Sequence, residues 1–277
     1  MKSGRVNPSS SLTEFYLLSQ KMKKPRVLVT NDDGIGCFFL QVLVEALKEH
    51  FTVVVVAPKT EQSWVSKSMS RYRAVKVEKF EGLNCPAWSV DGTPGDCVNI
   101  ALGNLLDEKP DVVASGINVG FNTSLPLIIC SGTIAGASEG ALWGLPALAF
   151  SIVVPEEIFN SVKSQNGHVD KEFETSLRTA ASISTKFTIE HTSKTPEDVI
   201  VHNVNFPYPV TNSTPIEHTI PDCRGIGGLF KHFGEETYQF SFDQSKRLNT
   251  SGKLTDRDCV NQGSISYSLL NFSKISC

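Results

Sequence analysis

The sequence predicts an α/β protein with a doubly wound, mostly parallel sheet and a β-rich C-terminal extension. Two observations support this fold class. Residues 26–58 read as strand, helix, strand, and both strands are apolar throughout, as in parallel strands that are covered on both faces. Strands and helices then alternate to about residue 155, whereas short polar segments with alternating aromatic residues follow residue 208.

The first unit is a βαβ motif. Residues 26–30 form a short apolar run that predicts a buried strand. Residues 51–58, "FTVVVVAP", are a second β-branched strand that ends at Pro58. The segment between them predicts a helix over residues 37–50, because its apolar residues recur at the spacing of one helix face: Phe39, Val42, Leu43, Ala46 and Leu47.

The same alternation continues along the core. Thr93 stands at the N-cap of one helix, and Pro94 at its first position. The predicted strands are residues 72–80, 87–90, 110–116, 146–152 and 199–207, and the predicted helices are residues 94–106, 131–143 and 170–187.

Three regions follow from these patterns. Residues 1–24 are polar and Ser-rich without a signal-peptide core, and we expect a disordered extension there. Residues 25–207 form the α/β core. Residues 208–277 are read as a β-rich extension with hairpins, since Tyr238, Phe240 and Phe242 alternate. We expect this extension to reach a second subunit as an oligomerisation arm.

Composition excludes several classes of function. The chain has 277 residues, 20% charged, and a formal net charge of -3, so no basic excess indicates a nucleic-acid partner. No apolar run reaches the ~18 residues of a membrane span. The seven cysteines are scattered and form no Cys-x-x-Cys pair, which favours reduced thiols and a cytoplasmic location: Cys37, Cys85, Cys97, Cys130, Cys223, Cys259 and Cys277.

Two adjacent carboxylates follow the first strand. In open α/β sheets, ligands bind beyond the carboxyl ends of the strands. Gly34 and Gly36 let the chain turn there, so that Asp32 and Asp33 can converge on one point. A divalent cation would make the two negative charges favourable, and oxygen ligands suit Mg²⁺, Mn²⁺ or Ca²⁺. The alternative is an ordinary Asp-Gly turn in which Asp33 caps the next helix.

Other polar groups follow the later strands, at the same predicted edge. Each has a plain alternative as a solvated loop residue, a turn or a helix cap. Together they place a hard cation beside an anion-binding helix start, which is an arrangement suited to phosphate hydrolysis. The groups are Gln62, Ser63 and Ser66 after the second strand, Asn118 and Asn122 in "SGINVGFN", and Ser131, Gly132 and Thr133 in "CSGTIAG".

Five ordered motifs resemble the SurE family. They are "VLVTNDDG", "DGTPGDCVNIAL", "DVVASGINVGFN", "SGTIAGASEGA" and "HNVNFP", and they span residues 27–207. The resemblance implies a Rossmann-like SurE fold and a 5'/3'-nucleotidase of the acid-phosphatase type. It also implies one divalent cation per subunit, commonly Mg²⁺ or Mn²⁺, a nucleoside monophosphate substrate, and a homodimer or homotetramer joined through the C-terminal extension.

The resemblance also assigns residues to roles. It implies that Asp32, Asp33, Ser63 and Asn118 hold the metal. The family usually has glycine directly after the metal-binding serine, where this chain has Trp64. Trp64 narrows the site or stacks on a base, or the register shifts toward Ser66. The residues that match the phosphate and substrate pocket are Asn31, Asn122, Ser131, Gly132 and Thr133.

The resulting hypothesis is metal-assisted attack of water on a phosphomonoester. Asp32 takes a proton from the water, and the backbone amides at residues 131–133 stabilise the phosphoryl oxygens. One rival mechanism is a covalent aspartyl-phosphate on the same carboxylate pair. A rival of another class is a non-catalytic nucleotide or phosphate sensor on the same fold.

Overall fold

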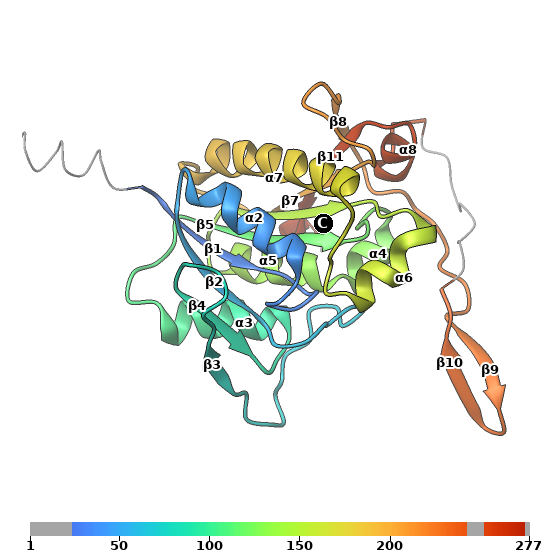
Figure 1. Cartoon of the computed structure of the whole chain (residues 1–277), viewed down its shortest axis with the longest axis horizontal. Helices are drawn as coiled ribbons and strands as arrows, with labels where there is room; N and C mark the ends of the chain where they lie inside the picture. The colour runs from blue at the N-terminus through green and yellow to red at the C-terminus, as the bar shows by residue number, and fades with distance from the viewer. Residues whose placement is uncertain (1–23, 243–251, 275–277) are drawn as a thin grey trace, which may run out of the picture.

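The protein is an α/β molecule around one large sheet, seen here in a computed structural model that describes residues 24–242 and 252–274 (Figure 1). The strands follow the order β3-β4-β2-β1-β5-β6-β7-β11-β8. Their bounds are β1 (Arg26–Thr30), β2 (Thr52–Pro58), β3 (Val77–Lys79), β4 (Ala87–Val90), β5 (Val112–Val119), β6 (Ala147–Ile152), β7 (Ile200–Phe206), β8 (Ile216–Thr219) and β11 (Ile265–Asn271). The pairings from β4 to β7 are parallel, which confirms the predicted doubly wound sheet.

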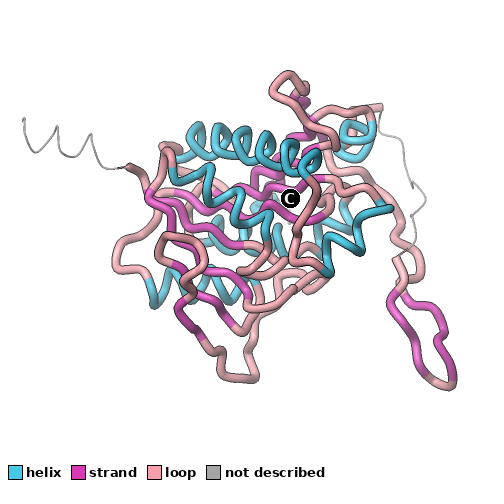
Figure 2. Tube along the Cα trace, viewed as in Figure 1, coloured by secondary structure: helices cyan, strands magenta, loops and turns pink. Residues whose placement is uncertain are grey.

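Helices cover both faces of the sheet, as Figure 2 shows. On one face lie α2 (Phe38–Lys48) and α7 (Lys171–Thr192), and on the other lie α3 (Pro94–Ile100) and α5 (Gly132–Leu142). Strand residues alternate between the two layers: Val27 and Val29 belong to the core beneath α2 and α7, and Leu28 to the core beneath α3. Because both faces are buried, the interior of β1 and nearly all of β2 are apolar.

The helix α3 begins as its sequence predicts. The Thr93 side chain accepts a hydrogen bond from the Asp96 amide at 3.1 Å, and the Asp96 carboxylate accepts one from the Thr93 amide at 2.9 Å. This capping box satisfies two amide groups that have no partner within the helix. The end of the helix differs from prediction, because the chain changes to a π-helix at Ala101–Leu105.

Some elements differ from the sequence prediction. The strand predicted over residues 72–80 is shortened to β3, at the edge of the sheet, where fewer neighbours order the chain. Three helices were not predicted: α4 (Leu125–Cys130), α6 (Glu156–Ser164) and α8 (Asp256–Asn261). All three are short, and α4 and α8 have only six residues each, too few for a helical period to be read.

The C-terminal region divides into two parts. Strand β11 pairs antiparallel with β7 and parallel with β8, so both β8 and β11 belong to the main sheet. By contrast, β9 (Phe230–Gly234) and β10 (Thr237–Phe240) form a separate antiparallel hairpin that projects from the body of the molecule (Figure 1). The predicted hairpin is therefore present, whereas the rest of the extension completes the core sheet.

Two remaining expectations concern the chain ends and the cysteines. Apart from Lys24, the predicted N-terminal extension lies outside the described residues. The six cysteines within the described ranges are all free thiols. In the same ranges, no helix is both long and apolar enough to cross a membrane.

Candidate functional site

The turn after β1 brings two carboxylates to the carboxyl edge of the sheet. Gly34 has a φ of +99°, in a region that glycine adopts without strain. The Asn31 side-chain amide donates to the Gly34 carbonyl at 2.9 Å, and the Gln62 amide donates to the Asp32 carbonyl at 2.7 Å. Asn31 is fully buried. Its observed contact therefore shapes the turn, and its predicted contact with substrate stays a prediction.

Asp32 faces the start of α5. Its carboxylate accepts a hydrogen bond from the Thr133 hydroxyl at 2.7 Å, and the residue is only 4% exposed. Gly132 passes so close that a Cβ there would lie 2.6 Å from the Asp32 Cβ. The glycine in "SGT" is thus required by the close approach of the helix to the carboxylate.

Asp33 turns the other way. One carboxylate oxygen accepts from the Val119 amide at 2.9 Å, at the end of β5. The other accepts from the Lys163 ammonium at 2.6 Å. The side chain of Asp33 is 3% exposed, so both carboxylates of the pair are desolvated.

Burial gives this pair an unusual proton affinity. Burial and the negative charge of Asp33 raise the pKa of Asp32 to about 7, although the Thr133 hydrogen bond lowers it. Burial also raises the pKa of Asp33, against the lowering effect of Lys163. Two adjacent buried carboxylates are stable in their charged form only when a cation neutralises them. The pair therefore has the electrostatic character of a cation site.

Ser63 lies in the loop after β2, close to the Lys163 ammonium group that contacts Asp33. Its hydroxyl donates to the Glu61 carboxylate at 2.6 Å and lies 3.5 Å from the Lys163 ammonium. Because Lys163 also bonds Asp33, one ammonium group lies within reach of Asp33, Glu61 and Ser63. Lys163 and Glu61 were not among the predicted site residues. No local motif marks Lys163, which comes from the short helix α6.

Asn118 is brought to the edge by an irregularity in β5. Ser115 pairs with Ala149 and Asn118 with Ser151, so β5 has one more residue than β6 between these pairs. Such a bulge changes the direction of the side chains that follow it. Gly116 permits it, with a φ of +128° and the Phe150 carbonyl only 2.3 Å from where a Cβ would lie.

Asn118 is positioned by its own amide group. Its nitrogen donates to the Gly120 carbonyl at 2.9 Å. This contact leaves the side-chain oxygen as the atom suited to a ligand. The next residue, Val119, donates its amide to Asp33, so Asn118 lies beside the carboxylate pair.

A buried polar network supports the start of α5. Asn122 donates from its side chain to the Thr133 hydroxyl at 3.1 Å and to the Ser151 hydroxyl at 2.9 Å. Its backbone is held by Asn205, whose side chain accepts from the Asn122 amide at 2.7 Å, and by Asn203, which donates to its carbonyl at 2.9 Å. The motif "HNVNFP" thus supplies two positioning residues that sequence reasoning did not assign.

Ser131 is the N-cap of α5. Its hydroxyl accepts from the Ile134 amide at 3.1 Å, as its position before the helix predicts. Gly132 and Thr133 form the first turn, where backbone amides have no partner within the helix. Thr133 therefore links the predicted anion-binding helix start to Asp32 through its hydrogen bond.

Trp64 occupies a left-handed backbone position with a φ of +63°, which agrees with the glycine usual there. Its ring packs against Phe240 and Phe242, with centroid distances of 4.9 and 5.4 Å. The tryptophan thus anchors the C-terminal hairpin. Ser63, not Ser66, is the serine that lies within reach of the ammonium beside Asp33.

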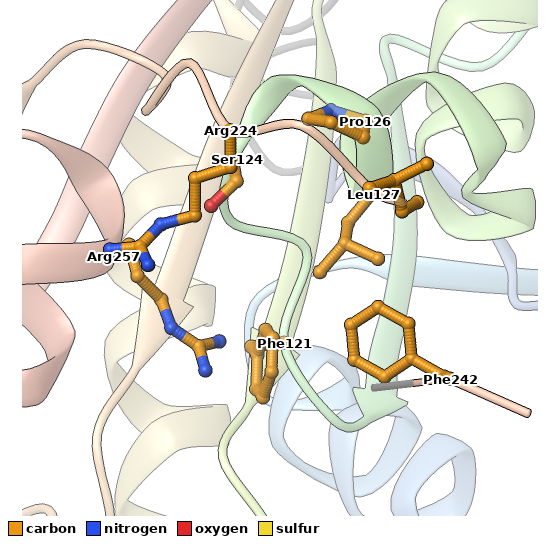
Figure 3. A pocket seen from close by; sticks show the side chains of 8 residues that line it. Phe121, Ser124, Pro126, Leu127, Arg224, Phe242 and Arg257 are labelled. Carbon is orange, nitrogen blue, oxygen red and sulfur yellow. The ribbon is translucent and has the colours of Figure 1, made fainter. Parts of the chain in front are cut away.

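Two hollows adjoin the site. The larger, about 430 Å³, is lined by Asp33, Glu61 and Lys163 together with Phe80 and Lys59. Figure 3 shows the other, where the Arg257 guanidinium lies 3.8 Å from the centre of the Phe121 ring. Arg224 and Phe242 also line this second hollow. It therefore lies between C-terminal residues and the segment that follows Asn122.

The residues fit a hard cation by their chemistry. Two buried carboxylates, one carboxamide oxygen and one hydroxyl are the donors that Mg²⁺ and Mn²⁺ prefer. Within the described ranges, no group of three or more His, Cys, Asp or Glu side chains is arranged to hold a metal. The predicted set differs from such groups because half of its donors are neutral oxygens.

Comparison with known proteins identifies the family. Residues 27–224 match the family model "Survival protein SurE". The chain is 35% identical over 199 residues to "5'-nucleotidase SurE" of Methanosarcina barkeri, covering 72% of this chain and 73% of that protein. It is 43% identical over 130 residues to the protein of the same name in Protochlamydia amoebophila, covering 46% and 49% respectively.

A solved structure agrees with this result. The SurE protein of Aquifex aeolicus matches with a TM-score of 0.70 and 28% identity, over 91% of this chain and 95% of that one. The match includes the doubly wound sheet whose carboxyl edge carries Asp32, Asp33 and Asn118. By family model, sequence and structure, this chain belongs to the SurE family.

Proposed function

We propose that the protein is a metal-dependent phosphomonoesterase that hydrolyses nucleoside 5'- and/or 3'-monophosphates to nucleoside and phosphate by metal-assisted attack of water. The observation that carries the proposal is the buried Asp32–Asp33 pair beside the Thr133 hydroxyl at the start of α5. Curated relatives named 5'-nucleotidase SurE support the nucleotide substrate.

One divalent cation per subunit completes the proposed site. Asp32, Asp33, Ser63 and Asn118 would hold it, and Mg²⁺ or Mn²⁺ suits these oxygen donors best, with Ca²⁺ as a possible substitute. When bound, the cation withdraws charge from the phosphoryl group and lowers the pKa of bound water.

The protein's own groups supply the remaining chemistry. Asp32 acts as the general base, and the Thr133 hydroxyl orients its carboxylate through the 2.7 Å hydrogen bond. Backbone amides of Gly132 and Thr133 at the helix start stabilise negative charge on the phosphoryl oxygens. Asn122 holds Thr133 in place, and Ser131 caps the helix that presents the amides.

The proposal includes assembly and location. The hairpin β9–β10 exposes Phe230, Phe233 and Tyr238, which suits an arm that packs on a second subunit in a homodimer or homotetramer. The free thiols among the described cysteines are compatible with a cytoplasmic location.

A phosphate-release assay tests the activity directly. Purified protein is supplied with a panel of nucleoside 5'- and 3'-monophosphates and with p-nitrophenyl phosphate, in the presence of Mg²⁺, Mn²⁺ or EDTA. We expect release with a divalent cation, loss of release with EDTA, and recovery when the cation is restored. Absence of release from every compound would instead support a nucleotide or phosphate sensor.

A further inference from the structure

The ammonium group of Lys163 lies against two of the residues proposed to hold the metal, Asp33 and Ser63. It is 2.6 Å from an Asp33 oxygen, 2.6 Å from a Glu61 oxygen and 3.5 Å from the Ser63 hydroxyl. The three oxygen atoms come from the turn after β1 and the loop after β2, whereas Lys163 comes from α6. The lysine side chain is 20% exposed, so solvent screens these contacts only in part.

Two of these oxygens belong to residues that the proposed cation would use. A divalent cation and an ammonium group cannot occupy the same position, because their charges repel and each requires direct contact with the oxygen atoms. The site thus contains a positive charge that is covalently tethered to the protein. The ammonium group thus shares two of the four proposed metal ligands, Asp33 and Ser63.

We propose that Lys163 is an internal competitor of the divalent cation. Its ammonium group neutralises Asp33 and Glu61 in the metal-free protein, and a divalent cation binds only by displacing it. This inference rests on the proposed function, because it requires a cation to bind at Asp33.

The surroundings allow the displacement. Lys163 also lines the hollow of about 430 Å³ beside Asp33, which offers the long side chain an alternative position. The cation must break two charge-assisted hydrogen bonds to enter, so the lysine weakens its affinity. Lys163 therefore sets the free cation concentration at which the site fills.

Four proteins test the competition: the parent chain, K163Q, K163R and K59Q. Lys59 lines the same hollow but bonds Glu78 at 3.2 Å, so K59Q is the matched control. Binding of Mn²⁺ alone is measured by electron paramagnetic resonance without substrate. We expect K163Q to bind Mn²⁺ roughly tenfold more tightly than the parent, since a lost charge-assisted hydrogen bond commonly changes affinity by about that factor. K163R and K59Q should stay close to the parent.

The outcomes separate the two proposals. Equal or weaker Mn²⁺ binding by a folded K163Q would contradict the competition while leaving the metal site intact. Absence of Mn²⁺ binding in all four proteins would contradict the proposed metal site itself. Thermal unfolding of each metal-free variant establishes that it is folded.

A second measurement does not depend on K163Q. Incorporation of lysine labelled with ¹³C at Cε marks each lysine side chain and leaves its ammonium group unchanged. The Lys163 resonance is assigned by its absence in K163R, and the Lys59 resonance by its absence in K59R. Saturation with Mg²⁺ should shift the first and leave the second in place. A Lys163 resonance that does not move would overturn the displacement.

Discussion

The carboxylate pair shows how position decides the role of single residues. Asp32 and Asp33 are adjacent in sequence, yet Asp32 contacts Thr133 and Asp33 contacts Lys163 and the Val119 amide. The turn at Gly34 separates their directions, and burial makes both dependent on positive partners. Substitutions at this pair therefore test the proposed chemistry at its centre.

Asp33→Asn should lower phosphate release by about 10²–10⁴-fold, the range of a lost catalytic carboxylate. The amide has nearly the same shape but no charge for a cation, so the circular dichroism spectrum should match the parent. Near-parent turnover in a folded Asp33→Asn variant would remove Asp33 from the mechanism. Asp111→Asn, at the opposite end of the first strand, is the control, since its carboxylate contacts the Arg26 amide.

Thr133→Val should reduce turnover by about 10–100-fold, as is typical when the partner of a ligand is lost. The methyl group cannot donate to Asp32 or accept from Asn122, and both groups are buried. Thr133→Ser keeps the hydroxyl and should retain most of the activity. Equal rates for the valine and serine variants would show that the hydroxyl does not orient Asp32.

The positions of some of these residues could be predicted from the sequence, and those of others could not. Asp32 and Asp33 follow β1 and Asn118 lies at the end of β5, so their position at one sheet edge follows from topology. Lys163 lies 130 residues from Asp33 in the chain, on a helix with no motif. Its role arises from tertiary packing, which no local pattern records.

At the scale of elements, aromatic residues at the end of the hairpin β9–β10 pack on Trp64 of the loop after β2. Trp64 contacts both Phe240 and Phe242. A non-glycine residue at positive φ costs of order 1–3 kcal/mol, whereas each aromatic pair contributes about 0.5–1.5 kcal/mol beyond its buried area. The buried part of the Trp64 ring adds to the aromatic contacts, so together they outweigh the strain and help to hold the hairpin.

Trp64→Gly should therefore lower the free energy of unfolding by about 1–3 kcal/mol, because the lost aromatic contacts and buried ring area together exceed the relieved strain. The hairpin should also be released, and trypsin should cut faster at Lys231 within β9. Trp64→Phe keeps an aromatic ring and should keep the parent cleavage rate. Equal cleavage in the glycine and phenylalanine variants would show that Trp64 does not anchor the hairpin.

The pairing of β7 with β11 contains a second testable contact. His202 on β7 lies 2.7 Å from the Tyr267 hydroxyl on β11, and its ring centroid is 4.0 Å from that of His191 on α7. Burial lowers the pKa of His202 to about 3, and His191 and Lys194 would repel a proton on it whenever they are charged. Burial lowers the pKa of His191 as well. The folded protein thus keeps both imidazoles neutral.

Stability should consequently fall in acid. Below about pH 6.5, the usual pKa of histidine, His202 is protonated in the unfolded chain. In the folded protein it stays neutral until the pH falls to about 3, so acid favours the unfolded state. Each pH unit in this window lowers the free energy of unfolding by at most about 1.4 kcal/mol for one such histidine. Urea unfolding of His202→Gln between pH 4 and pH 7 should show a smaller slope. A slope equal to that of the parent would exclude His202 as its source.

The elements differ in how far the sequence predicts them. Long periodic segments such as α2 and α7, and apolar strands such as β2, follow from local pattern. The place of β11 in the sheet does not, because its partner β7 lies more than sixty residues earlier in the chain and no local pattern specifies which strand it joins. The bulge in β5 that presents Asn118 likewise depends on pairing with β6 rather than on local propensity.

At the scale of the whole molecule, the hairpin pairs with no third strand within the described part of its own chain. An isolated two-stranded hairpin is marginal in water, and this one exposes Phe233 and Tyr238 by 71% and 66%. Figure 1 shows it projecting beyond the core. Within the chain, Phe240 of the hairpin packs on Trp64. A second subunit that covers these rings would stabilise it and bury the apolar area.

We therefore expect the parent chain to be a homo-oligomer and the double variant Phe233→Asp with Tyr238→Asp to be a monomer, by light scattering during size exclusion. Both substitutions leave the Trp64 contacts with Phe240 and Phe242 intact, so the hairpin stays anchored. Tyr72→Asp is the control, since Tyr72 is 91% exposed on the body of the molecule and should leave the assembly unchanged. A monomeric parent, or an oligomeric double variant, would contradict the role of the hairpin. Because the hairpin is anchored to the loop that carries Ser63, loss of the partner should also lower turnover more in the double variant than in Tyr72→Asp.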